Sequence, residues 1–117
     1  MSLIEEIGRL GADTEDALNR FKGNAALYER MLKKFPDVSE KSSVMPFIDS
    51  GDLETAAAHA HTLKGVVGNL SLNVLYESYS KIVLLLREGK ADEARELLEK
   101  TLESERSIIE TIRKYSE

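Results

Sequence analysis

The feature that most constrains this chain is a series of three long helical segments joined by very short connections. Hydrophobic residues recur with helical spacing over residues 52–70, 73–88 and 91–115, and no stretch alternates polar and β-branched residues as a strand would. The connections between these segments are only about two to four residues long, so consecutive helices must run antiparallel. We therefore predict an all-α fold of the antiparallel up-and-down bundle type.

The first half of the chain is divided by residues that begin or interrupt helices. Asp13 or Thr14 is expected to cap a short helix, and residues 23–24 open the next one. Pro36 should end or bend that second helix, because proline lacks a backbone N–H. Residues 37–49 favour a shorter or kinked helix. The complete prediction is a four-helix bundle with an additional short N-terminal helix, in one domain over residues 1–117.

Capping residues and apolar stripes support these helix boundaries. Asp52 and Asn73 are good N-caps, and Gly89 lies where a C-terminal left-handed residue belongs. Two stripes mark the core faces of the last two helices: Leu75, Tyr79, Ile82 and Leu86 on one, and Ala94, Leu98, Leu102, Ile109 and Ile112 on the other. Glu105 lies on the second stripe, and we expect its carboxylate to reach solvent at the edge of the bundle.

Composition excludes several classes of protein. A net charge of −5 argues against nucleic-acid binding, which needs a basic face, and the absence of cysteine excludes disulfides and thiolate chemistry. The longest uncharged apolar stretch, residues 82–86, is far shorter than the roughly 20 residues that span a bilayer. Glu5 and Glu6 stand where a signal peptide would carry basic residues. We therefore expect a cytoplasmic protein without direct membrane insertion.

The helix predicted over residues 52–70 carries the candidate site. At about 100° per residue, His61 falls on the boundary between core and solvent. The buried stripe consists of Ala60 and the residues within about 80° of it: Leu53, Ala56, Ala57, Leu63, Val67 and Leu70. Its neighbours on that side are mostly small, among them Ala58, Gly65 and Gly68. Glycine within a helix costs about 1 kcal/mol relative to alanine. We infer that the two glycines keep the surface low, so that the backbone of a partner can approach His61.

Lys64 and His59 help to define what His61 could do. Lys64 lies one turn after His61, where its ammonium can neutralise an anion such as a phosphorylated imidazole. His59 lies about 200° from His61 around the helix axis, so the two rings cannot bind the same metal ion. The Glu-x-x-His pattern of di-iron bundles is also missing, because alanine stands three residues before each histidine. A metal-binding or cofactor-binding bundle is therefore the weakest alternative.

Residues 60–70, AHTLKGVVGNL, resemble the signature of the HPt (histidine-containing phosphotransfer) domain family, in which H-x-L-K-G carries the phosphorylated histidine. Weaker similarity covers most of the chain. Residues 16–21 (DALNRF), 23–24 (GN) and 27–28 (LY) look like the opening helices of that family. Residues 51–52 (GD), followed by an alanine-rich run, look like the lead into its active helix. The resemblance implies a small four-helix bundle with an extra N-terminal helix.

The resemblance also implies roles for individual residues. His61 matches the phosphorylated histidine and Lys64 the lysine that neutralises the phosphate. Such a domain accepts a phosphoryl group from a receiver-domain aspartate and passes it to another receiver, and it has no ATP-dependent kinase site of its own. The implied partner-binding surface consists of small and polar residues of the same helix: Ala58, Gly65, Gly68 and Asn69.

The chain departs from the family pattern at two positions. Ser71 stands where the family often has glycine, a small-for-small change that we expect the helix end to tolerate. Val83 stands where some members place a Gln or Glu that holds the second imidazole nitrogen. Tyr79, Ser80 or water would then have to hold that nitrogen of His61.

The implied partners are response-regulator receiver domains and a hybrid sensor histidine kinase, of which the chain could also be the excised end. No cofactor is expected on this chain, and Mg²⁺ is expected on the partner receiver. An alternative to phosphotransfer is an interaction module of the same fold that docks receivers without carrying phosphate. The presence of both His61 and Lys64 argues against that alternative.

Overall fold

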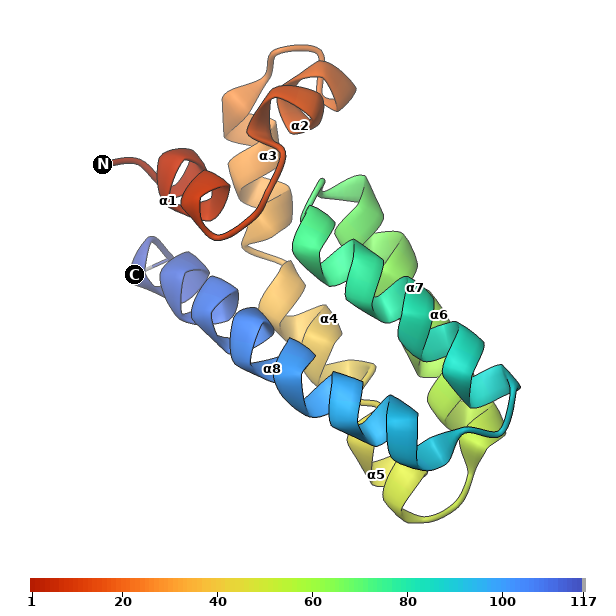
Figure 1. The fold of residues 1–117 in the computed structure, drawn as a ribbon. Coiled ribbons are helices and arrows are strands. Elements are labelled where there is room, and N and C mark those ends of the chain that lie inside the picture. Colours follow the sequence, from red (N-terminus) through yellow and green to blue (C-terminus); the bar gives the residue numbers. More distant parts are fainter. Residues whose placement is uncertain (117) are drawn as a thin grey trace.

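The computed structural model describes residues 1–116, and within them the chain forms eight α-helices and no strand. The three long helices are α6 (Leu53–Asn69), α7 (Asn73–Arg87) and α8 (Ala91–Lys114), which run up and down beside one another (Figure 1). The five short helices precede them: α1 (Leu3–Arg9), α2 (Thr14–Arg20), α3 (Ala25–Leu32), α4 (Phe35–Lys41) and α5 (Met45–Asp49). The predicted all-α bundle is confirmed.

The fourth side of the bundle is made by short helices rather than by one long helix. Both α4 and α5 pack against α6 and α8. Pro36 lies in the first turn of α4 and Pro46 in the first turn of α5. Proline is tolerated there because the first N–H groups of a helix have no intrahelical acceptor. The shorter or kinked helix predicted over residues 37–49 is therefore two helices. The prediction that Pro36 ends or bends the preceding helix is wrong, because α3 already ends at Leu32 and Pro36 lies in the first turn of α4.

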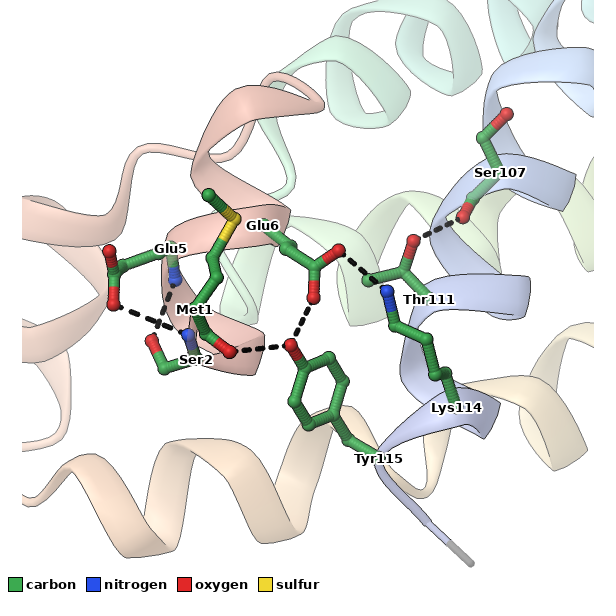
Figure 2. A network of polar contacts seen from close by, with 8 residues as sticks. All are labelled: Met1, Ser2, Glu5, Glu6, Ser107, Thr111, Lys114 and Tyr115. Atoms are coloured by element: carbon green, nitrogen blue, oxygen red, sulfur yellow. Dashed lines mark hydrogen bonds and ion pairs between the residues drawn. The ribbon is translucent and has the colours of Figure 1, made fainter.

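The N-terminal part contains one helix more than predicted. Helix α1 starts with a capping box, in which the Ser2 hydroxyl accepts from the Glu5 N–H at 3.1 Å and the Glu5 carboxylate accepts from the Ser2 N–H at 3.3 Å. Helix α1 also contacts the C-terminal end of α8, as Figure 2 shows. The Lys114 ammonium donates to Glu6 at 2.7 Å, and the Tyr115 hydroxyl donates to the same carboxylate. The first and last helices are thus tied together.

The predicted core faces are largely buried. The stripe of α7 is fully buried: Leu75, Tyr79, Ile82 and Leu86. On α8 the stripe contains both buried residues, namely Ala94, Leu98 and Ile112, and partly buried ones, namely Leu102 and Ile109. Helix α7 packs against α6 and also against α8, so it lies between the other two long helices.

Two of the three predicted caps are confirmed. The Asp52 carboxylate accepts from the Thr55 N–H at 3.1 Å, and Gly89 has the left-handed φ of 75°. The prediction that Asn73 caps α7 is wrong, because Leu72 is the N-cap residue and Asn73 is the first helical residue. Leu72 is buried in the core, and its anchoring sets where the next helix can begin.

Candidate functional site

The candidate site lies on α6, and both ends of this helix are held firmly. Asp52 caps its N-terminus, and hydrogen bonding to Thr55 lowers the pKa of the Asp52 carboxyl. The C-terminus closes with a Schellman motif, in which the Leu72 N–H donates to the Val67 carbonyl at 2.9 Å and the Ser71 N–H donates to the Gly68 carbonyl at 3.1 Å.

Residues from the N-terminal helices hold the same C-terminal end of α6. The Tyr28 hydroxyl donates to the Leu70 carbonyl at 2.7 Å, and burial raises the pKa of Tyr28 to about 12. The Asp13 N–H donates to the Ser71 carbonyl at 2.9 Å, and the Ser71 hydroxyl donates to Asp16 at 2.7 Å. This hydrogen bond adds to that from Arg20 in lowering the pKa of Asp16.

Ser71 adopts a backbone conformation that normally favours glycine. Its φ of 54° lies in the left-handed region, where a side chain costs about 1–2 kcal/mol. This is the position at which the resemblance to the HPt family led us to expect glycine, and a left-handed φ is a physical reason for glycine there. The hydroxyl bond to Asp16 and the complete Schellman motif offset part of the cost. The expectation of a simple small-for-small change therefore did not take into account the left-handed backbone conformation of Ser71.

His61 lies in the middle of α6 with an exposed side chain. Within residues 1–116, neither of its ring nitrogens makes a hydrogen bond to the protein. Tyr79 and Ser80, the side chains predicted to hold one nitrogen, are engaged elsewhere. The Tyr79 hydroxyl donates to Glu105 at 2.8 Å, and the Ser80 hydroxyl donates to the Tyr76 carbonyl at 2.7 Å. Both nitrogens of His61 are thus free to face solvent or a partner.

His59 lies on a different side of α6 and belongs to the packing against α5. Its Nδ1 is 2.7 Å from the Ser43 carbonyl, which requires a proton on that nitrogen. Its ring meets the edge of Phe47 with the centroids 4.8 Å apart. The separation of the two histidines predicted from helical geometry is confirmed, and only His61 is exposed.

The two glycines near His61 differ in their surroundings. A β-carbon placed on Gly65 would meet no atom within 4 Å, so this position leaves the surface open as predicted. A β-carbon placed on Gly68 would lie 3.0 Å from Cδ1 of Tyr76 on α7. The expectation that Gly68 keeps an open surface is wrong, because the Tyr76 ring fills the space beside it. Ala58 and Asn69 are exposed on the same helix.

Lys64 is half-buried and reaches toward the same ring. Its ammonium nitrogen lies 6.0 Å from the centroid of Tyr76, at the limit of a cation–π contact. Sequence reasoning missed Tyr76, which lies beside the buried stripe of α7 rather than on it. The available signal was Gly68 itself, because an isolated glycine within a helix often has a packing reason.

In a comparison with protein-family models, the model of the Hpt domain matches residues 3–114. The chain belongs to the Hpt domain family. Hpt domains are the histidine phosphotransfer modules of two-component systems, and they generally interact with receiver domains and kinases. No match is found among curated proteins or among solved structures.

A buried carboxyl group lies deeper in this Hpt domain. Glu105 on α8 is only 4% exposed, so the prediction that it reaches solvent is wrong. Its carboxylate accepts from the Tyr79 hydroxyl at 2.8 Å and from the Ser39 hydroxyl at 3.2 Å. Burial raises the pKa of Glu105, and burial beside that carboxylate also raises the pKa of Tyr79. The three side chains connect α4, α7 and α8 inside the core.

Within residues 1–116, no group of three or more histidine, aspartate or glutamate side chains is arranged to hold a metal ion. None of the helices over the same residues is long and apolar enough to cross a membrane.

Proposed function

We propose that this Hpt domain, as one domain over residues 1–117, carries a phosphoryl group on His61 between receiver-domain aspartates in a His-Asp phosphorelay. The observation that carries the proposal is the position of His61. Its ring is exposed, makes no hydrogen bond within residues 1–116, and lies beside an open glycine on a helix anchored at both ends. His59, the other histidine, is occupied by Ser43 and Phe47.

The proposed transfer is a substitution at phosphorus. Nε2 of the neutral imidazole attacks the phosphorus of a receiver aspartyl phosphate, and the N–P bond forms as the bond to the aspartate oxygen breaks. The bonding electron pair leaves with the aspartate carboxylate, and Nδ1 keeps its proton. The reverse reaction delivers the phosphoryl group to the aspartate of a second receiver. Lys64 partly neutralises the charge of the phosphoryl oxygens on His61.

The partners of this reaction follow from what it needs. A receiver domain supplies the aspartate, and we place the Mg²⁺ that assists the leaving carboxylate on that receiver. Ala58, Gly65, Gly68 and Asn69 are proposed to lie under the docked receiver, with Gly65 as the most open position. A hybrid sensor kinase is the proposed source of the phosphoryl group, which places the domain in the cytoplasm, either as a free protein or as part of a larger kinase.

The two histidines provide a matched test of the proposal. A receiver domain charged with labelled phosphoryl groups is incubated with the wild type, His61→Gln and His59→Gln, after thermal melts have shown that all three are folded. We expect acid-labile, alkali-stable label on the wild type and on His59→Gln, and none on His61→Gln. Label that survives in His61→Gln would place the carrier elsewhere. A wild type that binds the receiver but takes no label would support a docking module instead.

A further inference from the structure

Of the two glycines near His61, only Gly68 packs against a neighbouring side chain, the ring of Tyr76. Tyr76 lies in the first turn of α7, and a β-carbon on Gly68 would lie 3.0 Å from its Cδ1 and 3.1 Å from its Cε1. Such distances are shorter than ordinary carbon–carbon contacts of about 3.5–4.0 Å. The ring is 40% exposed, so one side of it rests on the backbone of α6 while the rest meets solvent.

Lys64 is the charged residue that this ring reaches. Lys64 precedes Gly68 by four residues, so both lie on one side of α6, and its ammonium lies 6.0 Å from the centroid of Tyr76. Within residues 1–116, Lys64 forms no ion pair with a carboxylate. Its backbone is about 4.5 Å along the helix axis from that of His61, one turn away. The ammonium of Lys64 therefore contacts the Tyr76 ring on the side of α6 that carries His61.

We propose that Tyr76 is a positioning residue, whose ring holds the ammonium of Lys64 on the side of α6 that carries His61. The inference rests on the proposed function and deepens it, because it identifies what prepares Lys64 before the phosphoryl group arrives. A free lysine side chain samples many rotamers, and restricting them costs entropy when the anion binds. A ring fixed on Gly68 restricts them beforehand. The ring face provides the attraction, so the tyrosine hydroxyl is not needed.

A small phosphodonor tests this role without any docked receiver. Phosphoramidate phosphorylates a histidine directly: the N–P bond to the imidazole forms, the donor N–P bond breaks, and ammonia leaves. The rate of phosphohistidine formation is measured by intact-protein mass spectrometry for the wild type, Tyr76→Leu and Tyr76→Phe. Leu84→Gln is the matched control, because Leu84 is an exposed residue of the same helix about 12 Å further along its axis.

We expect Tyr76→Leu to slow phosphorylation by about two- to fivefold, the range that an exposed cation–π contact supports. Tyr76→Phe and Leu84→Gln should react like the wild type. The decisive comparison is made in a Lys64→Ala background, where Tyr76→Leu should cause no further loss because the residue through which it acts is gone. A role in fold stability alone would slow both backgrounds equally.

A second measurement does not depend on the reaction. In NMR spectra, the ring current of an aromatic side chain should shift the ε-methylene protons of Lys64 in the wild type and in Tyr76→Phe, and the shift should disappear in Tyr76→Leu. A wild type that reacts at His61 together with an unchanged or faster Tyr76→Leu would overturn the inference alone. Absence of the ring-current shift would also overturn it. A wild type that takes no phosphoryl group at His61 would overturn the proposed function.

Discussion

Replacing each of the two glycines of α6 with alanine should affect stability differently, although both lie in the interior of the same helix. Alanine is favoured over glycine in a helix interior by about 1 kcal/mol. At Gly65 the added methyl group meets no atom within 4 Å, so the whole gain should be realised. We expect Gly65→Ala to raise the free energy of unfolding by about 1 kcal/mol, or the melting temperature by about 4 °C in a domain of this size.

At Gly68 the same gain is opposed by the contact with Tyr76. The added carbon would lie 3.0 Å from Cδ1, so the ring must move outward by about 0.5 Å or more to restore ordinary contact. Displacing the ring from its rotamer costs on the order of 0.5–1 kcal/mol. The net change for Gly68→Ala should therefore be close to zero. In a Tyr76→Ala background the obstacle is absent, and Gly68→Ala should again stabilise by about 1 kcal/mol.

Urea unfolding followed by far-UV circular dichroism measures all of these variants. A gain of 1 kcal/mol should raise the midpoint by about 0.5 M if the slope is about 2 kcal/mol per molar urea and does not change. The coupling between positions 68 and 76 should then be about 0.5–1 kcal/mol. Equal gains at Gly65 and Gly68, or the same Gly68→Ala effect with and without the tyrosine ring, would refute the packing argument.

Two further predictions concern Glu105 and Ser71. Burial raises the pKa of Glu105 above its ordinary 4.5, so the stability from its protonated form is complete below that value and is lost as the pH rises through the raised pKa. Thermal melts at a series of pH values rising from 4.5 should therefore show a growing advantage of Glu105→Gln over the wild type, and a constant difference would contradict this. Ser71→Ala loses the hydrogen bond to Asp16 and should lower the free energy of unfolding by about 1 kcal/mol. Ser71→Gly loses the same bond but also relieves the strain of the left-handed φ, so its stability should be close to that of the wild type. Equal urea midpoints for the two variants would contradict the strain argument.

The features that could be predicted from the sequence are those set by a single helix. The rotation of about 100° per residue places His61 and His59 on different sides of α6 whatever surrounds them. The cap at Asp52 is likewise a local interaction, since its acceptor and donor are three residues apart. For this reason the position and exposure of His61 were correctly predicted without knowledge of the neighbouring helices.

The features that were missed depend on how helices are placed against one another. The Tyr76 contact requires the register between α6 and α7, which is set by the turn at Ser71 and the burial of Leu72. Glu105 lies on an apolar stripe, and we expected its carboxylate to reach solvent because the sequence shows no partner for a buried charge. Its two hydroxyl partners lie on α4 and α7, and they become visible only when the helices are packed together. The seven residues of α1 are too few to form a helix alone, and contacts with α8 support them.

The arrangement of α6 separates what is rigid from what can move. Its ends are fixed by Asp52 and by the Tyr28 hydroxyl, so the backbone that carries His61 cannot shift easily when a phosphoryl group is added. The proposed contact with the Tyr76 ring restricts the Lys64 ammonium to one side of α6, and it is weak enough for the ammonium to adjust when a phosphoryl anion binds. If His61 carries the phosphoryl group as proposed, the imidazole would therefore keep one position for each receiver, and Lys64 would need only a small movement to meet the new charge.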